Sequence, residues 1–208
     1  MIIAKIITIV GMTIGGRYME ANSRQNDLAL YSQIEDEYGK VMYTYTTQVI
    51  QARRLHKRNA ILKWGQMILS AISAGGFIGT LITNQVMLTW LGGICSTVLL
   101  VLTAYFKDTD LSSAHKRHLD TANQLWLLRE LYLSLLIDFS TLSRDDVVSK
   151  RNELQQRVSK VYNDAPLTDE KSYSIAQKML KEKESQFFAR EELNKILPES
   201  LRKSSQSK

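Results

Sequence analysis

The sequence predicts an all-α protein: a two-transmembrane helical hairpin extended by cytoplasmic amphipathic helices that form an antiparallel stalk. From Trp64 to Phe106 the chain has no Asp, Glu, Lys or Arg, although 23% of the whole sequence is charged. Apart from residues 2–10, no segment alternates apolar and polar residues as half-buried strands do. On both sides of the uncharged run, apolar residues recur at three- and four-residue steps, which is typical of packed helices.

Residues 1–24 are an apolar leader whose assignment stays open. Met1–Gly16 contains only one charged residue, Lys5, and is too short for a comfortable membrane span. It also lacks a convincing signal-peptide cleavage site. One interpretation is an interfacial segment; the other is that Met19 is the true start and residues 1–18 are an over-extension. We favour the second.

Residues 25–63 are expected to form a cytoplasmic helix that runs straight toward the first span. Its apolar stripe has the spacing of a helical seam, and Gln48 fills the one polar step. The stripe consists of Tyr31, Ile34, Tyr38, Val41, Tyr45, Ala52, Leu55 and Leu62.

The uncharged run, residues 64–106, is long enough for two membrane crossings of roughly 20 residues each. Its only polar break, residues 83–85, divides it into expected spans at 64–82 and 86–106. Trp64, Trp90 and Tyr105 lie where interfacial aromatic belts are expected. We therefore expect a hairpin with a short turn on the far side of the membrane.

Small residues recur on one face of each span, and such faces let helix backbones approach closely. The helix-packing or pore face consists of Ala71, Gly75, Gly79, Gly92 and Ser96. Two uses stay open: packing of the spans on each other, and oligomerisation around a pore. Because neither span contains a charge, a pore would have to come from several chains. Its candidate lining residues are Ser70, Ser73, Thr80, Ser96, Thr97 and Thr103.

Basic residues flank the hairpin on both sides, whereas its turn has no charge. Under the positive-inside rule, both flanks and both termini are cytoplasmic, and the basic side chains contact anionic lipid headgroups. This membrane-orienting cluster consists of Arg53, Arg54, Lys57, Arg58, Lys63 and Lys107. The net charge of +6 could also suggest nucleic acid. We do not favour it, because the cluster abuts a span and lacks interleaved aromatic residues.

Residues 107–198 are expected to form a cytoplasmic helical region that returns beside the first helix. Its stripe consists of Leu111, Ala114, His118, Ala122, Leu125, Tyr132, Leu135 and Phe139. Ser143, followed by Asp145 and Asp146, predicts the N-cap of a further helix. Pro166 predicts a break, and residues 168–170 predict another helix start. A last short helix is expected around 193–197, and residues 199–208 are expected to be disordered.

We find no active-site motif in the sequence, so we predict no catalytic residue, no cofactor and no metal. The glycines lack the spacing of a phosphate-binding loop. His115 and His118 share a helix face, but nearby Asp110 and Asp120 are interpreted as surface charges. The single cysteine, Cys95, excludes a disulfide within one chain and is interpreted as a small apolar residue.

A series of short motifs around the hairpin resembles the SLATT family, the SMODS- and SLOG-associating two-transmembrane effector domains. The resemblance covers about residues 25–185. Its first motifs are the helix with basic and aromatic residues before the hairpin and the hairpin itself. Two further motifs follow the hairpin: the segment that begins with residues 115–117 and ends with residues 123–130, and residues 162–168 followed by Tyr173 and Ala176.

The resemblance implies an effector of bacterial anti-phage defence in the inner membrane, which oligomerises and breaches the membrane. Its trigger is expected to be a separate sensor protein, such as a nucleotidyltransferase or a reverse transcriptase. If the chain binds a nucleotide, Arg129, Arg151 and Arg157 are candidates, although we favour a solvated face for them. The alternative function is a membrane-anchored helical scaffold without pore activity. A phage holin fits the hairpin but does not require so large a C-terminal part.

Overall fold

The computed structural model describes residues 2–83, 86–108, 110–182 and 192, including the side chains of 24–79, 86–106, 110–182 and 192. These residues form helices only, as the sequence predicts. The helices are α1 (Ile2–Thr83), α2 (Val86–Asp108), α3 (Leu111–Asp138), α4 (Arg144–Asp164) and α5 (Glu170–Lys181). The short helix expected around 193–197 and the tail at 199–208 lie outside the described residues.

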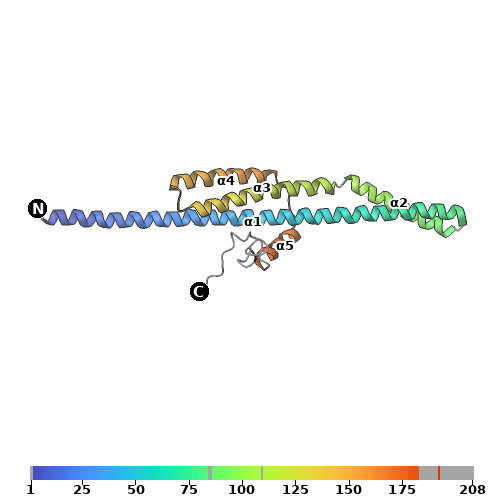
Figure 1. Ribbon diagram of the computed structural model, residues 1–208, viewed down its shortest axis with the longest axis horizontal. Coiled ribbons are helices and arrows are strands. Elements are labelled where there is room, and N and C mark those ends of the chain that lie inside the picture. The colour runs from blue at the N-terminus through green and yellow to red at the C-terminus, as the bar shows by residue number, and fades with distance from the viewer. Residues whose placement is uncertain (1, 84–85, 109, 183–191, 193–208) are drawn as a thin grey trace, which may run out of the picture.

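The helix α1 is the axis of the molecule, and every other helix packs along it (Figure 1). It is continuous for 82 residues, so the boundary expected at 63/64 falls inside one helix. Its C-terminal part pairs with α2, and its middle pairs with α3. Figure 1 shows α3 and α4 on one side of α1 and α5 on the other.

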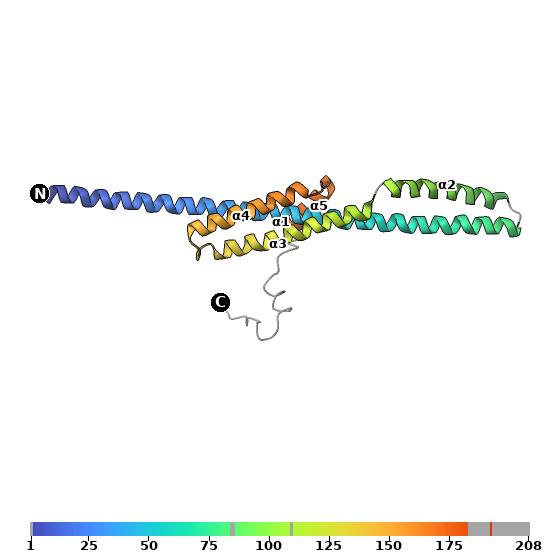
Figure 2. The ribbon, with the colours of Figure 1, turned by 90° about the horizontal axis from the view of Figure 1, so that it is seen from above.

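The second span does not continue into the helical stalk as one helix, in contrast to the first. The helix α2 ends at Asp108, and a new helix begins at Leu111. Asp110 is the N-cap of α3, and its carboxylate accepts a hydrogen bond from the Ser113 backbone N–H at 2.9 Å. Because this cap starts a separate helix, α3 can leave the direction of α2 and lie along α1 (Figure 2).

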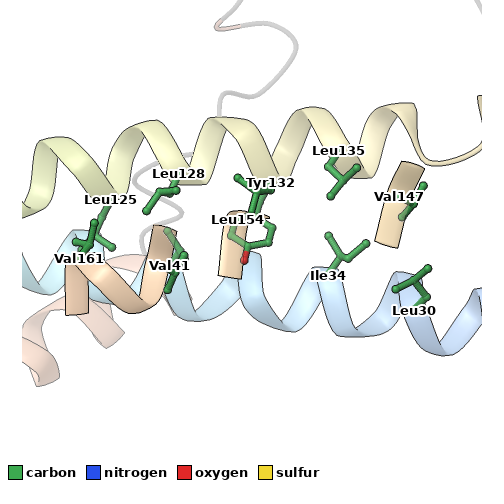
Figure 3. Packing of buried hydrophobic residues seen from close by; sticks show 11 residues of the cluster. Leu30, Ile34, Val41, Leu125, Leu128, Tyr132, Leu135, Val147, Leu154 and Val161 are labelled. Carbon is green, nitrogen blue, oxygen red and sulfur yellow. The ribbon is translucent and has the colours of Figure 1, made fainter. Parts of the chain in front are cut away.

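The hydrophobic core lies between α1, α3 and α4 (Figure 3). The apolar stripes on either side of the hairpin supply most of the α1 and α3 side chains, to which Leu30 and Leu128 add, and α4 closes the core from outside. The buried residues are Leu30, Ile34, Val41, Leu125, Leu128, Tyr132, Leu135, Val147, Leu154, Val158 and Val161. Burial of apolar side chains at about 25 cal/mol per Å² holds the three helices together.

The caps of α4 and α5 follow the predictions from the sequence. Ser143 is the N-cap of α4, and its hydroxyl accepts a hydrogen bond from the Asp146 backbone N–H at 3.2 Å. Asp169 is the N-cap of α5 and accepts from the Ser172 backbone N–H at 2.7 Å. The break between the two helices includes Pro166, as expected.

Two buried hydrogen bonds connect the helices at Gln48, the one polar position in the apolar stripe of α1. His118 Nδ1 on α3 donates to the Gln48 side-chain oxygen at 2.5 Å. The Gln48 amide nitrogen in turn donates to the Pro166 carbonyl at 3.1 Å. Because both side chains are buried, each needs a hydrogen-bond partner. The two hydrogen bonds join α1, α3 and the linker between α4 and α5, and they fix the register of these elements.

These buried hydrogen bonds predict that the helical body, in which α3, α4 and α5 pack on α1, loses stability in mild acid. Burial first, and the neighbouring Arg117 second, lower the pKa of His118 below its ordinary value of 6.5. The unfolded chain therefore binds a proton near pH 6.5 that the folded chain resists, so the free energy of unfolding falls as the pH drops below that value. Thermal unfolding of the purified chain in detergent at pH 7.5 and 5.5 should show a lower midpoint in acid.

The control is His118→Asn, whose amide nitrogen can stand in for Nδ1 but does not titrate in this range. Its unfolding midpoint should change much less between the two pH values. Each kcal/mol of lost stability should lower the midpoint by about 2–4 °C in a chain of this size. An equal acid shift in the wild type and the variant would contradict the assignment to His118.

Candidate functional site

The hairpin of α1 and α2 carries a continuous apolar outer surface. Two described segments, one within Arg24–Gly79 and one within Val86–Asp138, are long and apolar enough to cross a membrane. Their large side chains point outward: Phe77 is 67% exposed, Trp90 71% and Leu100 72%. Soluble proteins rarely expose an apolar surface of this extent to water. Together with the two uncharged spans, this surface makes the chain a membrane protein.

The two spans approach closely where small residues face each other. A Cβ atom added to Gly76 would lie 3.3 Å from the Leu88 carbonyl oxygen and 3.4 Å from the Gly92 Cα. Gly92 is buried, and the Ser73 and Ser96 hydroxyls are hydrogen-bonded across the same contact. The absence of side-chain bulk at Gly76 and Gly92 therefore lets the helix backbones come together.

Polar side chains from both spans gather on one side of this contact. Gln66 donates to the Thr103 hydroxyl at 3.3 Å, nearer the helical body formed by α3, α4 and α5 on α1. Further along, an open groove of about 590 Å³ runs between the spans. Its polar and small lining residues are Ser70, Ser73, Ala74, Thr89, Gly92, Gly93 and Ser96, and Phe77, Leu88 and Leu99 complete the lining. The groove is therefore mainly apolar, with hydroxyl groups from both spans among its lining.

The five residues of the expected helix-packing or pore face lie in two different places. Gly92 and Ser96 line the contact between the spans, and a Cβ at Gly79 would approach the Leu88 side chain at 3.1 Å. Ala71 and Gly75 are exposed, and a Cβ at Gly75 would meet no described atom within 4 Å.

Gly76, which contacts α2, was missed by the sequence reasoning. A signal was present: adjacent residues on a helix point about 100° apart, so Gly75 and Gly76 could not share one face.

Among the candidate pore-lining residues, Ser70, Ser73 and Ser96 line the groove. Thr103 lies in a neighbouring hollow with Ser96. Thr97 is exposed and donates to its own helix at the Gly93 carbonyl. The side chain of Thr80 lies outside the described residues.

The basic cluster divides into solvent-facing residues and residues with protein partners. Arg53, Lys57 and Lys63 are exposed. Arg58 donates to the Tyr105 hydroxyl at 2.6 Å, with its guanidinium carbon 5.9 Å from the ring centroid. This contact ties the start of the first span to the end of the second. The side chain of Lys107 lies outside the described residues.

Arg54 holds α5 against α1. It pairs with Asp169, the N-cap of α5, and also donates to the Ser172 hydroxyl at 2.7 Å. Partial burial would raise the pKa of Asp169, but hydrogen bonds from Ser172 and Arg54 outweigh it and keep the pKa below 3.8. Ser172 is buried and donates in turn to Gln51 of α1 at 2.5 Å. We call these four residues the α5 clamp; the sequence alone did not indicate it.

The histidines and the candidate nucleotide-binding arginines do not converge on one site. His115 donates through Nδ1 to the Ala52 carbonyl at 2.8 Å, and its ring lies 5.1 Å from that of His56. Among the described residues, no group of three or more His, Cys, Asp or Glu could hold a metal ion. Arg129 pairs with Glu130, Arg151 donates to Gln33 and Arg157 lies 3.7 Å from Glu153.

Comparison with known proteins identifies one family. Residues 30–192, more than three quarters of the chain, match the family described as SMODS and SLOG-associating 2TM effector domain family 4. No curated protein and no solved structure matches.

The close contact at Gly76 predicts a sharp difference between two adjacent glycines. Gly76→Leu should separate the spans, because its side chain would collide with the α2 backbone, whereas Gly75→Leu should leave the hairpin closed. Cysteines at Ser73 and Ser96, with Cys95→Ser, should form a disulfide that reports this contact. Overpacking costs roughly 1–3 kcal/mol, so Gly76→Leu should lower the crosslinked fraction about tenfold. Equal crosslinking in both variants would contradict this packing.

The α5 clamp predicts that α5 loosens when one charge is removed. Asp169→Asn keeps a capping side chain but loses the ion pair with Arg54. Amide hydrogen exchange across 170–181 should therefore become faster, while exchange in α4 stays unchanged. The matched control is Asp145→Asn, an exposed acidic residue in the first turn of α4. Unchanged α5 exchange in Asp169→Asn would show that the pair does not hold the helix.

Proposed function

The chain belongs to the SMODS and SLOG-associating 2TM effector domain family 4, and from this premise we propose that it is a membrane effector of bacterial anti-phage defence. In this proposal the hairpin is permanently inserted in the inner membrane, with both termini cytoplasmic. Several copies assemble and, on a signal, form a pore or disrupt the bilayer. The signal comes from a separate sensor protein, a nucleotidyltransferase or a reverse transcriptase.

The observation that supports the pore proposal is the groove between the spans, in which hydroxyl groups of both helices lie among apolar side chains. Ser70 and Ser73 of α1 share a groove with Thr89 and Ser96 of α2. Ser73 and Ser96 are hydrogen-bonded to each other within the hairpin, and in a ring of hairpins the hydroxyls of this groove can also face water. The apolar surface around them meets lipid. The groove therefore supplies a lumen-facing side that needs no charged residue.

The exposed small residues supply the contact between neighbouring hairpins. Ala71 and Gly75 lie on α1 away from α2, and the space beside Gly75 is open. A backbone without bulk on that side permits close approach of another helix. Intramolecular packing uses Gly76 and Gly92 instead, so the two small-residue faces have separate roles in this proposal.

The continuous helix α1 provides the mechanical connection between sensing and membrane. It runs without interruption from the cytoplasmic core into the first span, so a rotation of the body turns the span as well. The resting state is restrained by the core between α1, α3 and α4 and by the α5 clamp. In this proposal a sensor acts by rearranging these cytoplasmic helices, and the spans follow.

The basic residues give the orientation of the hairpin in this proposal. Arg53, Lys57 and Lys63 are exposed at the cytoplasmic end of the first span, within reach of anionic headgroups. Arg54 and Arg58 contribute to the charge of that end but have partners within the chain. Both ends of the hairpin therefore stay on the side of the body.

The test is membrane potential and dye entry in bacteria that express the chain with its neighbouring genes, before and after phage infection. Gly75→Leu should reduce triggered depolarisation about tenfold or more, because overpacking a helix contact costs roughly 1–3 kcal/mol. Gly65→Leu is the matched control in the same span, since a Cβ there also meets no described atom within 4 Å. Membrane levels of all variants should be equal.

Depolarisation that is lost in Gly75→Leu but kept in Gly65→Leu would support the pore. An intact membrane potential under every condition, with the wild-type chain properly inserted, would refute it. That outcome would favour the membrane-anchored scaffold, in which the hairpin is only an anchor and the helical body binds partners. Unlike a pore, a scaffold should tolerate leucine at both positions.

A further inference from the structure

The helix α3 carries a second apolar stripe that no other described helix covers. Its positions follow steps of four and three residues, which place them on one face of the helix. This outer stripe consists of Leu119, Asn123, Trp126, Glu130, Leu133 and Ile137. Trp126 is 47% exposed and Ile137 69% exposed. The stripe extends over about 27 Å at 1.5 Å per residue.

The outer stripe is separate from the core side of α3. The core side buries Leu125, Tyr132 and Leu135 against α1 and α4. The apolar residues of the outer stripe, in contrast, are exposed: Leu119 by 39%, Trp126 by 47%, Leu133 by 36% and Ile137 by 69%. Because it lies in the water-facing body, lipid cannot cover it. Large apolar residues in a helical a/d spacing are typical of a helix–helix interface.

We propose that the outer stripe pairs with the same stripe of a second copy of this chain, as a parallel two-fold coiled coil. The interface deepens the oligomeric effector proposed above, and it names the cytoplasmic contact through which copies pair at rest. Each residue of the stripe then faces its own counterpart, as an isologous interface requires.

The membrane decides the direction of the pairing. Two copies inserted with the same orientation have their bodies on the same side of the bilayer. The helix α3 begins directly after the second span and runs back along α1, so α3 points away from the membrane in both copies. A two-fold axis along the membrane normal therefore makes the stripes parallel and in register.

The two polar positions of the stripe suit such a self-pairing. An Asn in the seam of a parallel coiled coil can hydrogen-bond to its own counterpart and fix the register, and Asn123 holds this position. Glu130 brings a charge, but Arg129 of the same chain donates to its carboxylate. Two Glu130 carboxylates facing each other are thus accompanied by two guanidinium groups, and the seam carries no net charge.

The small area of the outer stripe favours a second copy in the same membrane as its binding partner. A stable complex between soluble proteins usually buries about 800 Å² on each partner, and a single row of four apolar side chains offers less. Copies confined to one membrane meet at a high effective concentration, so a small contact suffices for them. A soluble partner would not have this advantage.

The test is cysteine crosslinking of the full chain in bacterial membranes, with Cys95→Ser in every variant because Cys95 is the only native cysteine. Leu133→Cys and Ile137→Cys should each form disulfide-linked dimers on mild oxidation. The matched controls are Leu127→Cys and Ser134→Cys, which are exposed on the same helix but lie off the stripe. The dimer fraction should be several-fold higher on the stripe than off it.

The direction is tested by co-expressing Leu119→Cys with Ile137→Cys. A parallel pair gives crosslinks within each variant, whereas crosslinks mainly between the two variants would overturn the parallel arrangement. Absent dimers, or equal dimer fractions on and off the stripe, would overturn the interface itself. As a second readout, Trp126→Ser should lower co-purification of differently tagged copies roughly tenfold, and Leu127→Ser should not.

This experiment is independent of pore activity, because it examines the resting chain without phage or a sensor. Crosslinks on the stripe together with an unchanged membrane potential would keep the interface and remove the pore. Depolarisation without crosslinks on the stripe would keep the effector and remove this interface. The two proposals can therefore fail separately.

Discussion

The return of the chain through the membrane hairpin is the constraint on which the rest of the structure depends. Because α2 brings the chain back beside α1, α3 begins next to a helix that already presents an apolar stripe. The α1–α3 contact then buries Ile34, Val41, Leu125 and Tyr132, and it creates the groove on which α4 packs. The α5 clamp uses the opposite side of α1, which α3 leaves free.

The two halves of the molecule follow opposite rules because they lie in different solvents. In the helical body, apolar side chains are buried, and the buried Gln48 and His118 side chains are hydrogen-bonded to each other. In the hairpin, apolar side chains face outward, and the contact between the helices is made by glycine and serine. In lipid, burying leucine between helices brings no hydrophobic stabilisation, so close backbone packing and hydroxyl hydrogen bonds stabilise the helix contact instead.

Three surfaces of the chain are not covered by another described helix. The Gly75 side of α1 and the groove between the spans belong to the membrane hairpin, whereas the outer stripe of α3 belongs to the helical body. The helix α1 runs through both the hairpin and the body, so contacts between copies at one end can influence those at the other. A membrane effector that rests as a small assembly and enlarges on a signal would use such an arrangement.

Much of the fold could be predicted from the sequence, because the responsible signals are local. The uncharged run, the two stripes and the caps at Ser143 and Asp169 depend on composition and spacing within one segment. The pairings between segments could not: Arg54 was grouped with its basic neighbours, yet it binds Asp169, 115 residues away. Likewise, Gly75 and Gly76 are equivalent in sequence, and only the rotation of α1 against α2 decides which of them contacts Gly92. The sequence by itself determined which segments are helical and which of them face lipid or water, because hydrophobicity and periodicity are properties of each segment along the chain. Tertiary structure decided the partners, because rotation and distance exist only after the helices pack.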